Sequence, residues 1–310
     1  MAWQLTGIRA GPTSTSSRPD PPRRGRRSSR EARPYRPREL REAGVSPSKA
    51  LGQHFLTDYG YVSRIVAAAD LSPQDTVVEI GPGLGVLTER LAGIAGRVIA
   101  VELDTELATR LRERAPGNVT VVEADALTVE PEHLLEAAGL APDTPYALVG
   151  NLPYNVGTAI VRRFLEAARQ PTRLVVMLQK EVAEAMTKPA GELGLLSVSV
   201  QVYARARKLF NVPPRAFYPP PRVTSAVIRL DVHHEALVAP EERERFFRVV
   251  RAGFSAPRKQ LRNTLAQGLG LPPAAVAAAI EAEDLQPGLR PQQLRVEDWL
   301  RLSRRLGGSL

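Results

Sequence analysis

The segment GNLPYN (residues 150–155) places an amide, a proline and an aromatic ring directly after the apolar run YALV. That run predicts a buried strand that ends near this segment. Ligands of α/β proteins bind at the carboxyl ends of the strands. We therefore expect Asn151, Pro153 and Tyr154 to belong to a catalytic site.

A glycine-rich segment, TVVEIGPGLGVLTERLAG (residues 76–93), predicts a strand, a tight turn and a helix. The dinucleotide-binding pattern needs a further glycine at position 86, where this chain has Val86. The resulting G-x-G-x-G spacing favours S-adenosylmethionine over NAD as the cofactor. It also predicts that Gly81 and Gly83 contact the cofactor.

Acidic residues stand at the next two predicted strand ends, which supports this interpretation. Glu102 ends RVIAVE and is placed to accept hydrogen bonds from the ribose hydroxyls, while Asp125 follows VTVVEA and is placed to accept from the adenine amine of the cofactor. The alternative, a tight glycine turn that binds nothing, does not account for these acids.

Beside such a methyl donor, the residues of GNLPYN suit a target adenine. The exocyclic amine of adenine is a poor nucleophile because its lone pair is delocalised into the ring. The Asn151 side-chain oxygen and the Pro153 carbonyl could accept hydrogen bonds from the two N–H groups of this amine. The nitrogen would then be held in an attacking geometry without a general base. Tyr154 offers a ring face on which the base stacks. The alternative is a proline turn with Tyr154 in the core.

Elements that could position these residues follow from hydrophobic periodicity. Runs rich in Val and Ile alternate with helical patterns from Ser46 onward, which predicts an α/β fold with a parallel, doubly wound sheet. The later runs LSVSVQVYA (196–204) and TSAVIRLDV (224–232) predict antiparallel strands that complete it. We expect a disordered basic extension over residues 1–45, a methyltransferase domain over 46–235 and a helical RNA-binding domain over 236–310.

Composition narrows the class of protein. The chain has 310 residues, 43% of them hydrophobic, and no cysteine, so disulfides and thiol chemistry are excluded. No apolar run approaches the roughly 20 residues of a membrane span, and no secretory signal pattern is present, so we expect no membrane insertion and a cytoplasmic location. The four histidines lack metal-ligand spacing. We expect no metal.

The net charge of +9 is concentrated at the two ends of the chain. Residues 1–44 carry +7, residues 46–235 carry −2 and residues 236–310 carry +4. A polyanionic partner would therefore be held mainly by the ends. The Arg- and Ser-rich start has three interpretations that stay open, namely a solvated tail, an RNA-binding arm and an organelle transit peptide.

The chain resembles the ribosomal small-subunit RNA adenine dimethyltransferase family, the kasugamycin-sensitivity methyltransferases. The resemblance rests on eight blocks: KALGQHFL (49–56), EIGPGLGVLT (79–88), VELD (101–104), EADAL (123–127), GNLPYN (150–155), LQKEVA (178–183), VPPRAFYPPPRVTSAVIRL (212–230) and FSAPRKQLRNTL (254–265).

The resemblance implies a Rossmann-like class I methyltransferase sheet followed by a small helical domain, with S-adenosylmethionine as the cofactor. It implies that His54 and Leu56 close over the cofactor and that Asn151 completes its contacts. Phe217 would stack on the target adenine opposite Tyr154. The chain departs from the family at position 54, where Asn is common.

The implied activity is the transfer of methyl groups to the N6 amines of two adjacent adenines in a loop near the 3′ end of small-subunit (16S) rRNA, during ribosome biogenesis. The partner would be rRNA in an immature ribosomal subunit, and the protein a monomer. Two alternatives are a large-subunit (23S) rRNA methyltransferase of the antibiotic-resistance type and a non-catalytic RNA-binding or transcription factor on the same fold. Leu152 and the block FSAPRKQLRNTL favour a small-subunit over a large-subunit rRNA methyltransferase. The intact donor and acceptor motifs disfavour a non-catalytic factor.

Basic residues of the C-terminal part are candidates for phosphate contacts. Arg245, Arg248 and Arg251 recur every three residues and are expected on one helix face. A solvated face is the alternative, but a polyanionic substrate favours RNA contact. The full set of expected RNA-binding residues is Arg222, Arg245, Arg248, Arg251, Arg258 and Lys259.

Overall fold

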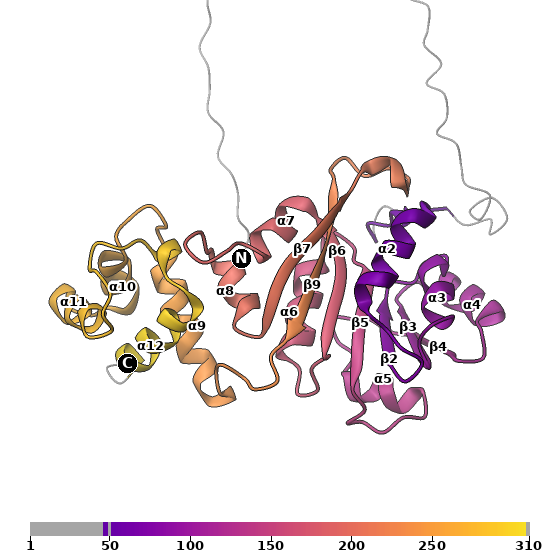
Figure 1. Ribbon diagram of the computed structural model, residues 1–310, viewed down its shortest axis with the longest axis horizontal. Coiled ribbons are helices and arrows are strands. Elements are labelled where there is room, and N and C mark those ends of the chain that lie inside the picture. The colour runs from indigo at the N-terminus through magenta and orange to yellow at the C-terminus, as the bar shows by residue number, and fades with distance from the viewer. Residues whose placement is uncertain (1–45, 49–50, 308–310) are drawn as a thin grey trace, which may run out of the picture. The chain divides into compact units, whose positions relative to one another are not determined.

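The computed structural model describes residues 46–48 and 51–307, so the predicted N-terminal extension lies outside the described residues. A twisted sheet with helices on both of its faces is followed by four C-terminal helices (Figure 1). The α/β fold and the helical C-terminal segment predicted from the sequence are confirmed.

The large sheet has seven strands in the order β4-β3-β2-β5-β6-β9-β7. Five of them are parallel, while β9 runs antiparallel to β6 and β7 antiparallel to β9. The bounds are β2 (Thr76–Ile80), β3 (Arg97–Glu102), β4 (Val119–Glu123), β5 (Tyr146–Asn151), β6 (Arg173–Gln179), β7 (Ala204–Val212) and β9 (Ser225–Val232).

Successive side chains of the central strands enter two separate cores, because residues alternate between the faces of a sheet. Val77 packs with α2 and α3 on one face, and Val78 packs with α5 and α6 on the other. Both faces are therefore covered, which is why these strands are continuous apolar runs. The helices around the sheet are α2 (Tyr59–Ala69), α3 (Val86–Ala92), α4 (Thr105–Arg114), α5 (Pro131–Ala137), α6 (Gly157–Glu166), α7 (Lys180–Met186) and α8 (Leu195–Gln201).

The prediction of a strand over LSVSVQVYA was wrong, since residues 195–201 form helix α8 and the strand β7 starts only at Ala204. The alternation of Ser and Val suggested a strand, but the two serines serve the helix. Ser197 donates to the Gly194 carbonyl at 2.9 Å, and Ser199 donates to the Leu195 carbonyl at 2.8 Å. Packing of Val198 and Val200 in the core stabilises the helix against the β-propensity of valine.

A small second sheet joins two segments that are far apart in the sequence. β1 (Phe55–Leu56) pairs antiparallel with β8 (Phe217–Tyr218), with Phe55 opposite Tyr218 and Leu56 opposite Phe217. The 3-10 turn η1 (Pro214–Ala216) leads into β8. The pairing brings the segment around His54 beside the proline-rich loop that follows Phe217.

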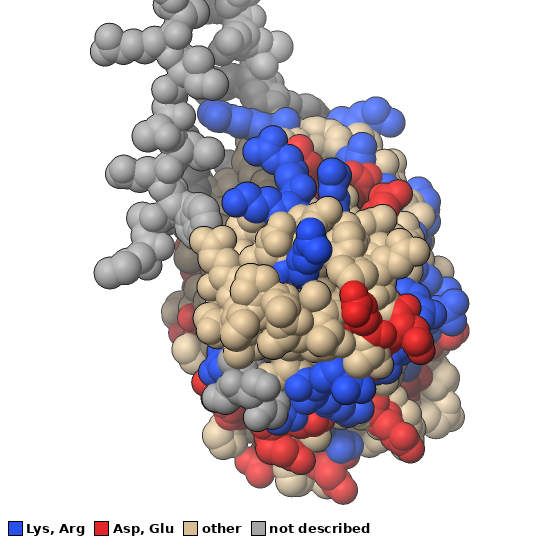
Figure 2. All heavy atoms as spheres, turned by 90° about the vertical axis from the view of Figure 1, so that its left-hand side faces the viewer, with Lys and Arg blue, Asp and Glu red and all other residues tan. Residues whose placement is uncertain are grey.

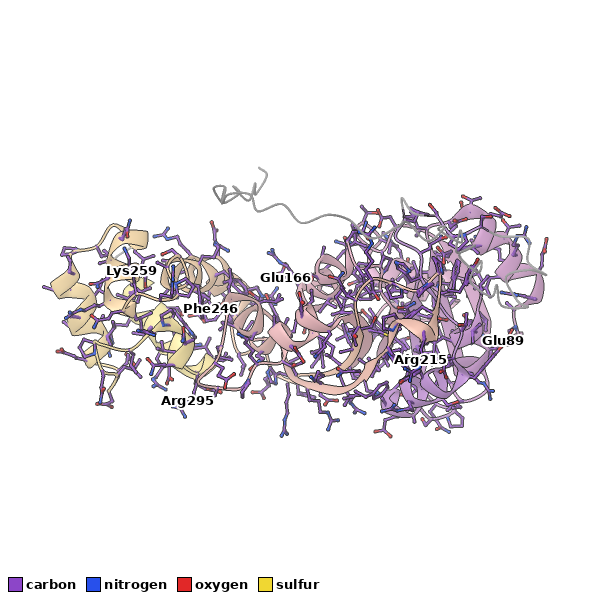
Figure 3. The ribbon with its side chains drawn as sticks, turned by 90° about the horizontal axis from the view of Figure 1, so that it is seen from above. Glu89, Glu166, Arg215, Phe246, Lys259 and Arg295 are labelled. Atoms are coloured by element: carbon purple, nitrogen blue, oxygen red, sulfur yellow. The ribbon has the colours of Figure 1, made fainter. Side chains whose placement is uncertain are left out.

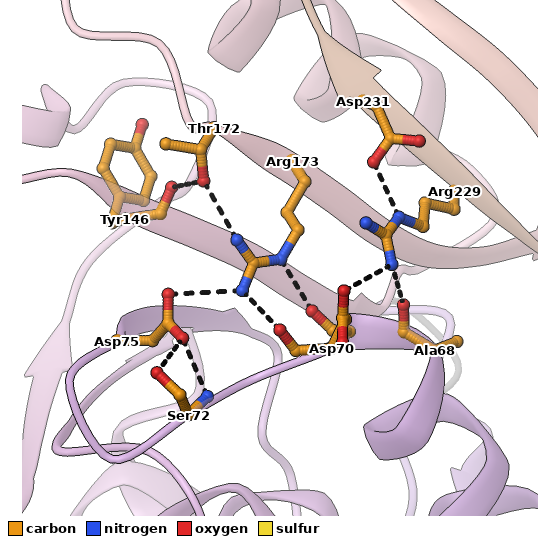
Figure 4. A network of polar contacts seen from close by, with 10 residues as sticks. Ala68, Asp70, Ser72, Asp75, Tyr146, Thr172, Arg173, Arg229 and Asp231 are labelled. Carbon is orange, nitrogen blue, oxygen red and sulfur yellow. Dashed lines mark hydrogen bonds and ion pairs between the residues drawn. The ribbon is translucent and has the colours of Figure 1, made fainter.

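Two arginines of the large sheet hold the carboxyl end of α2 (Figure 4). Arg173 donates to the carbonyls of Ala69 and Asp70 at 2.6 and 2.9 Å, and Arg229 donates to the Ala68 carbonyl at 2.9 Å. A cation at this end of a helix also offsets the negative pole of the helix dipole. Although burial raises the pKa of Asp75, hydrogen bonds from Ser72 and the Arg173 guanidinium lower it overall. The hydrogen bonds from Arg173 and Arg229 fix α2 to the end of the sheet opposite the glycine turn.

The C-terminal helices have their own aromatic centre. Trp299 is fully buried, and its ring centroid lies 5.3 Å from that of Phe254. The Trp299 ring leaves no room for a side chain at Gly253. These helices are α9 (Arg243–Gly253), α10 (Leu261–Leu269), α11 (Pro273–Glu281) and α12 (Val296–Gly307), with the 3-10 turns η2 (Pro240–Glu242) and η3 (Pro291–Gln293) between elements. The domain boundary at residues 235 and 236 stays a prediction. Among the described residues, no helix combines the length and apolarity required to cross a bilayer.

Candidate active site

A cavity of about 230 Å³ lies at the carboxyl ends of the parallel strands. Its described lining includes three carboxylic acids, Glu79, Glu102 and Asp125, and no Lys or Arg. Nine of the predicted residues line it: His54, Leu56, Gly81, Gly83, Glu102, Asp125, Asn151, Pro153 and Tyr154. The site thus combines a negative electrostatic character with mainly apolar walls, which suits a cationic ligand that carries an aromatic base.

The glycine turn borders this cavity. Gly81 and Gly83 have φ values of +66° and +55°, which side chains rarely adopt. A Cβ atom at Gly83 would lie 2.9 Å from the Phe55 ring, so any side chain there would displace Phe55. The turn therefore requires glycine both for its backbone conformation and for the close approach of β1.

The Glu102 carboxylate is held by two backbone N–H groups. Gly83 donates to Oε2 and Asp104 donates to Oε1, both at 3.0 Å. Burial raises the pKa of Glu102, while the N–H groups of Asp104 and Gly83 partly oppose the shift. Each oxygen keeps a lone pair, so a fixed carboxylate is available to two neighbouring hydroxyls.

Asp125 occupies the corresponding place after β4. Its Oδ1 accepts from the Leu127 N–H at 2.8 Å, which fixes the turn that follows the strand. Together with Glu102 and the glycine turn, it lines one continuous cavity over three adjacent strands. Both acids therefore line the space in which the adenine and ribose of a nucleoside are predicted to bind. The individual contacts stay predictions.

Asn151 is oriented by a hydrogen bond to the β1 segment. Its amide nitrogen donates to the His54 carbonyl at 2.9 Å, which leaves the side-chain oxygen available as an acceptor. The Pro153 carbonyl, in contrast, already accepts from Gly157 at 2.8 Å and from Val156 at 3.2 Å, at the start of α6. Both of its lone pairs are used, so the structure does not support its predicted role as an acceptor for a substrate amine.

Tyr154 is fixed at both ends of its side chain. Its hydroxyl lies 2.6 Å from the Ser225 hydroxyl, and its ring stacks on the His54 ring with centroids 5.6 Å apart. The His54 Nδ1 in turn lies 2.7 Å from the Pro219 carbonyl. His54 thus covers part of one face of Tyr154, and a base would stack on the remaining ring surface.

Phe217 does not line the cavity. Its side chain is 4% exposed and packs with Leu56, Val62 and Met177 in the core beneath β1. To stack on a substrate base, it would have to leave this core. The stacking role of Phe217 stays a prediction.

Substitution of Phe217 distinguishes packing from stacking. We expect Phe217→Ala to lower the free energy of unfolding by about 3–5 kcal/mol, because it leaves a cavity in the core. Phe217→Leu fills most of that space but lacks an aromatic face. Denaturant unfolding and methyl transfer would be measured for both variants. A tenfold loss of RNA-dependent turnover in Phe217→Leu, with unchanged stability and donor binding, would show that Phe217 stacks on the base.

The predicted RNA-binding residues fall into two groups. Arg245 forms an ion pair with Glu242 at 3.0 Å, which reduces its availability for phosphate. The other five are exposed, and within the described part of the chain they have no ion-pair partner: Arg222, Arg248, Arg251, Arg258 and Lys259.

The figures show where charge gathers on the C-terminal helices. Figure 2 shows Lys and Arg side chains gathered toward the top of the face that these helices form, above a neutral area. In Figure 3, Lys259 and Arg295 lie on opposite sides of the helical segment. Arg295 is paired with Asp298 at 3.2 Å, whereas Lys259 has no acidic partner among the described residues. The unpaired positive charge is thus available to a polyanion.

The residues of the cavity fit S-adenosylmethionine, which carries a positive charge. Three acids without a basic counterpart, a turn that admits close approach and an oriented Asn151 oxygen meet in one site. When bound, this cofactor supplies a sulfonium methyl group to a nucleophile. Among the described residues, no group of three or more His, Cys, Asp or Glu could hold a metal ion. The fold and the site define a Rossmann-like, S-adenosylmethionine-dependent methyltransferase.

A model of the family described as ribosomal RNA adenine dimethylase matches residues 46–307. The chain belongs to this family. A protein of Dehalococcoides mccartyi named ribosomal RNA small subunit methyltransferase A is 45% identical over 253 residues, which are 81% of this chain and 85% of that protein.

Two solved structures extend the comparison. The 23S rRNA methyltransferase ErmE, known from a crystal structure, shares 34% sequence identity with this chain. The two structures have a TM-score of 0.65 over 82% of this chain and 99% of that one. A dimethyladenosine transferase from Plasmodium falciparum is 23% identical, with a TM-score of 0.70 over 82% and 98% of the two chains, and shows the same fold.

Two features of the site were missed by the sequence interpretation. The Leu152 carbonyl follows Asn151 directly and accepts no hydrogen bond within the described part of the chain. Glu79 lines the cavity with a buried carboxyl group. The signal for Glu79 was present, since it is the only charged residue in the strand TVVEI. Nothing in the sequence distinguishes the Leu152 carbonyl from that of Pro153.

Proposed function

We propose that this protein transfers methyl groups to the N6 amines of two adjacent adenines in a loop near the 3′ end of small-subunit rRNA. The observation that carries the proposal is the pair of acceptors at the end of β5. The Asn151 amide nitrogen donates to the His54 carbonyl, which orients the side-chain oxygen, and this oxygen accepts no hydrogen bond from the described residues. The Leu152 carbonyl is the next acceptor along the chain. This pair replaces the predicted pair of Asn151 and Pro153.

These two acceptors would act on the amine in the following way. Each acceptor receives a hydrogen bond from one N–H group of the adenine amine. Together these two hydrogen bonds turn the nitrogen lone pair out of the ring plane and toward the methyl group. The oxygens are fixed before the substrate arrives, so little reorganisation is needed during the reaction. After methyl transfer the nitrogen is cationic and releases one proton to water. Tyr154, held by Ser225, supports the base by stacking.

The target RNA is inferred from the relatives. Proteins named ribosomal RNA small subunit methyltransferase A share 40–45% identity with this chain, whereas ErmE, named as a 23S rRNA enzyme, shares 34%. The small subunit is therefore the better-supported target. Action on the large subunit is the second candidate, supported by the likeness to ErmE.

The form of the substrate follows from the cavity and the charge distribution. An adenine can enter a cavity at the strand ends only if it leaves its stack, so a loop adenine is preferred over a paired one. Exposed cations on the C-terminal helices, such as Arg248, would bind phosphates of the surrounding RNA. We infer that the protein acts as a monomer, in the cytoplasm, on an immature small subunit.

A comparison of substrates tests this proposal. We expect radiolabelled methyl groups from the donor to enter the adenines of an immature small subunit at least about a hundredfold faster than those of a short hairpin with the same loop, because the hairpin lacks the surrounding phosphates. Arg248→Glu should lower turnover on the subunit by about tenfold and leave donor binding unchanged. Primer extension would locate the modified adenines.

Glu244→Arg is the matched control, since it changes charge at an exposed position of the same helix in the opposite sense. Equal turnover on the hairpin and the subunit, or a normal rate in Arg248→Glu, would show that the C-terminal helices do not position the RNA. Methylation confined to large-subunit rRNA would support the second candidate function.

A further inference from the structure

A second cavity, of about 340 Å³, is bordered by helices α6, α8 and α9, and the proposed mechanism does not use it. Helix α8 contacts both α6 and α9, so this α6/α8/α9 pocket lies where the sheet meets the C-terminal helices. Figure 3 shows Glu166, one of its lining residues, between these two parts of the chain. The pocket is larger than the catalytic cavity of about 230 Å³ and has room for a planar ring system.

The walls of the α6/α8/α9 pocket are mainly apolar. Leu165 of α6, Met186 of α7, and Leu196 and Val200 of α8 line it. Leu195, at the start of α8, also lines it and is 40% exposed. Exposed apolar surface gathered around a hollow marks an interaction site. The pocket therefore suits a ligand with an apolar, flat face.

Phe247 gives the pocket an aromatic wall that neighbouring side chains hold in place. The Phe246 ring meets Phe247 edge-on with centroids 5.1 Å apart, and the Tyr203 ring lies 6.4 Å from it. The Arg243 guanidinium covers the Tyr203 ring at 5.5 Å. Phe247 is half-buried by these contacts and also lines the pocket. It thus offers a fixed ring on which a nucleobase can stack.

The charges at the pocket favour an anionic ligand. Two arginines and one acid line it, and the acid, Glu166, is paired with Arg162 at 2.8 Å. The second arginine, Arg251, is exposed and has no ion-pair partner among the described residues. Arg248 precedes it by one turn of α9 and is likewise exposed. A fixed aromatic ring beside an unpaired cation is the combination that binds single-stranded nucleic acid.

Helix α6 connects the pocket with the catalytic site. Thr158, in the first turn of α6, lines the pocket and is exposed. It follows Tyr154 by four residues, so the Cα atoms of the two residues are at most about 14 Å apart. That distance corresponds to about four nucleotides of a stacked strand. An RNA strand whose target adenine reaches Tyr154 can therefore place a neighbouring nucleotide at the pocket.

We propose that the α6/α8/α9 pocket binds a second unstacked base of the substrate RNA, from a nucleotide close to the target adenine. The base stacks on Phe247, and its phosphate binds Arg251. This inference rests on the proposed function for the identity of the RNA. Two bound bases on one strand fix the direction in which the loop crosses α6. The second base contributes to RNA affinity, because it takes no part in the methyl transfer.

Immature small subunits reconstituted with rRNA that carries one abasic nucleotide test the proposal. The abasic site is moved through the nucleotides on both sides of the target adenines. We expect one position, outside the target adenines, at which loss of the base weakens binding to the wild-type protein about tenfold. Phe247→Leu keeps an apolar side chain but lacks the aromatic face. It should bind intact subunits about tenfold more weakly, raise the KM for the subunit by the same factor, and show no further loss at that abasic position.

A second variant blocks the pocket without removing a core contact. Leu195→Trp places a large ring in the pocket from an exposed position, so it should compete with the base and also weaken subunit binding about tenfold. Ile94→Trp is the matched control, since Ile94 is 42% exposed and lines neither cavity. This control should bind subunits as wild type does. Thermal unfolding would show that all three variants are folded.

Two results would overturn the proposal while methylation by the wild type stayed intact. The first is equal binding of every abasic subunit by the wild type. If Phe247→Leu and Leu195→Trp still bound intact subunits weakly in that case, the pocket would take a side chain of a ribosomal protein instead of a base. The second is an abasic effect that persists in full in both variants. Failure of the wild type to methylate small subunits at all would instead overturn the proposed function, and this inference with it.

Discussion

Asn151→Ala is expected to lower the rate of methyl transfer about a hundredfold or more, with less than about a tenfold change in donor affinity. The lost side-chain oxygen acts on the target amine in the transition state, and such acceptors contribute mainly to turnover. The moderate effect on donor binding comes from the hydrogen bond to the His54 carbonyl, which holds the β1 segment beside the cavity.

Single-turnover methylation with saturating donor, together with calorimetry of donor binding, separates the two effects. Asn211→Ala is the matched control, because Asn211 is an exposed amide on the edge strand β7 and far along the chain from the cavity residues. Turnover of Asn151→Ala at the wild-type rate would refute the role of this oxygen as an acceptor. A donor affinity that falls as far as turnover would instead assign Asn151 to donor binding.

Glu102→Ala is expected to give the opposite pattern, with donor affinity about a hundredfold or more weaker and a smaller change in the rate at saturating donor. A buried carboxylate that accepts two hydroxyl hydrogen bonds contributes about 1.5–3 kcal/mol through each. The carboxylate is already held by the N–H groups of Gly83 and Asp104, so the wild-type site needs little rearrangement on binding.

Donor affinity of Glu102→Ala would be measured by calorimetry, with Glu123→Ala as the control for loss of a carboxylate at the adjacent strand end. Thermal unfolding of the variant shows whether the turn at Gly83 survives the loss of its acceptor. If a folded Glu102→Ala protein binds the donor as tightly as wild type, the predicted ribose contact is wrong.

Local patterns in the sequence determined much of the sheet. The runs TVVEI and YALVGN coincide with β2 and β5, because strands buried on both faces must be continuously apolar. The glycine spacing around Gly81 and Gly83 predicted a tight turn after β2, and both residues have positive φ. In each case neighbouring residues of the chain determine the outcome.

Other features depend on contacts between distant segments, and local patterns did not reveal them. The run LSVSVQVYA has the alternation of a strand, yet its serines and buried valines form α8 against the rest of the core. The pairing of β1 with β8 joins Leu56 to Phe217 across more than half of the chain. Phe217 lies in the core beside this pairing and does not line the cavity, where the family resemblance implied a stacking role for it.

Most of the order of elements, the residue types at the strand ends and the family could be read from the sequence, since these depend on periodicity and on motifs along the chain. The hydrogen-bonding state of individual polar atoms, in contrast, became visible in the folded protein alone. Within the described part of the chain, the Pro153 carbonyl accepts from α6, the Asn151 amide nitrogen donates to His54 and its oxygen accepts nothing, and one Glu79 oxygen has no hydrogen-bond partner. Hydrogen bonding and desolvation depend on every segment that surrounds a group, so they become defined only when the chain has folded.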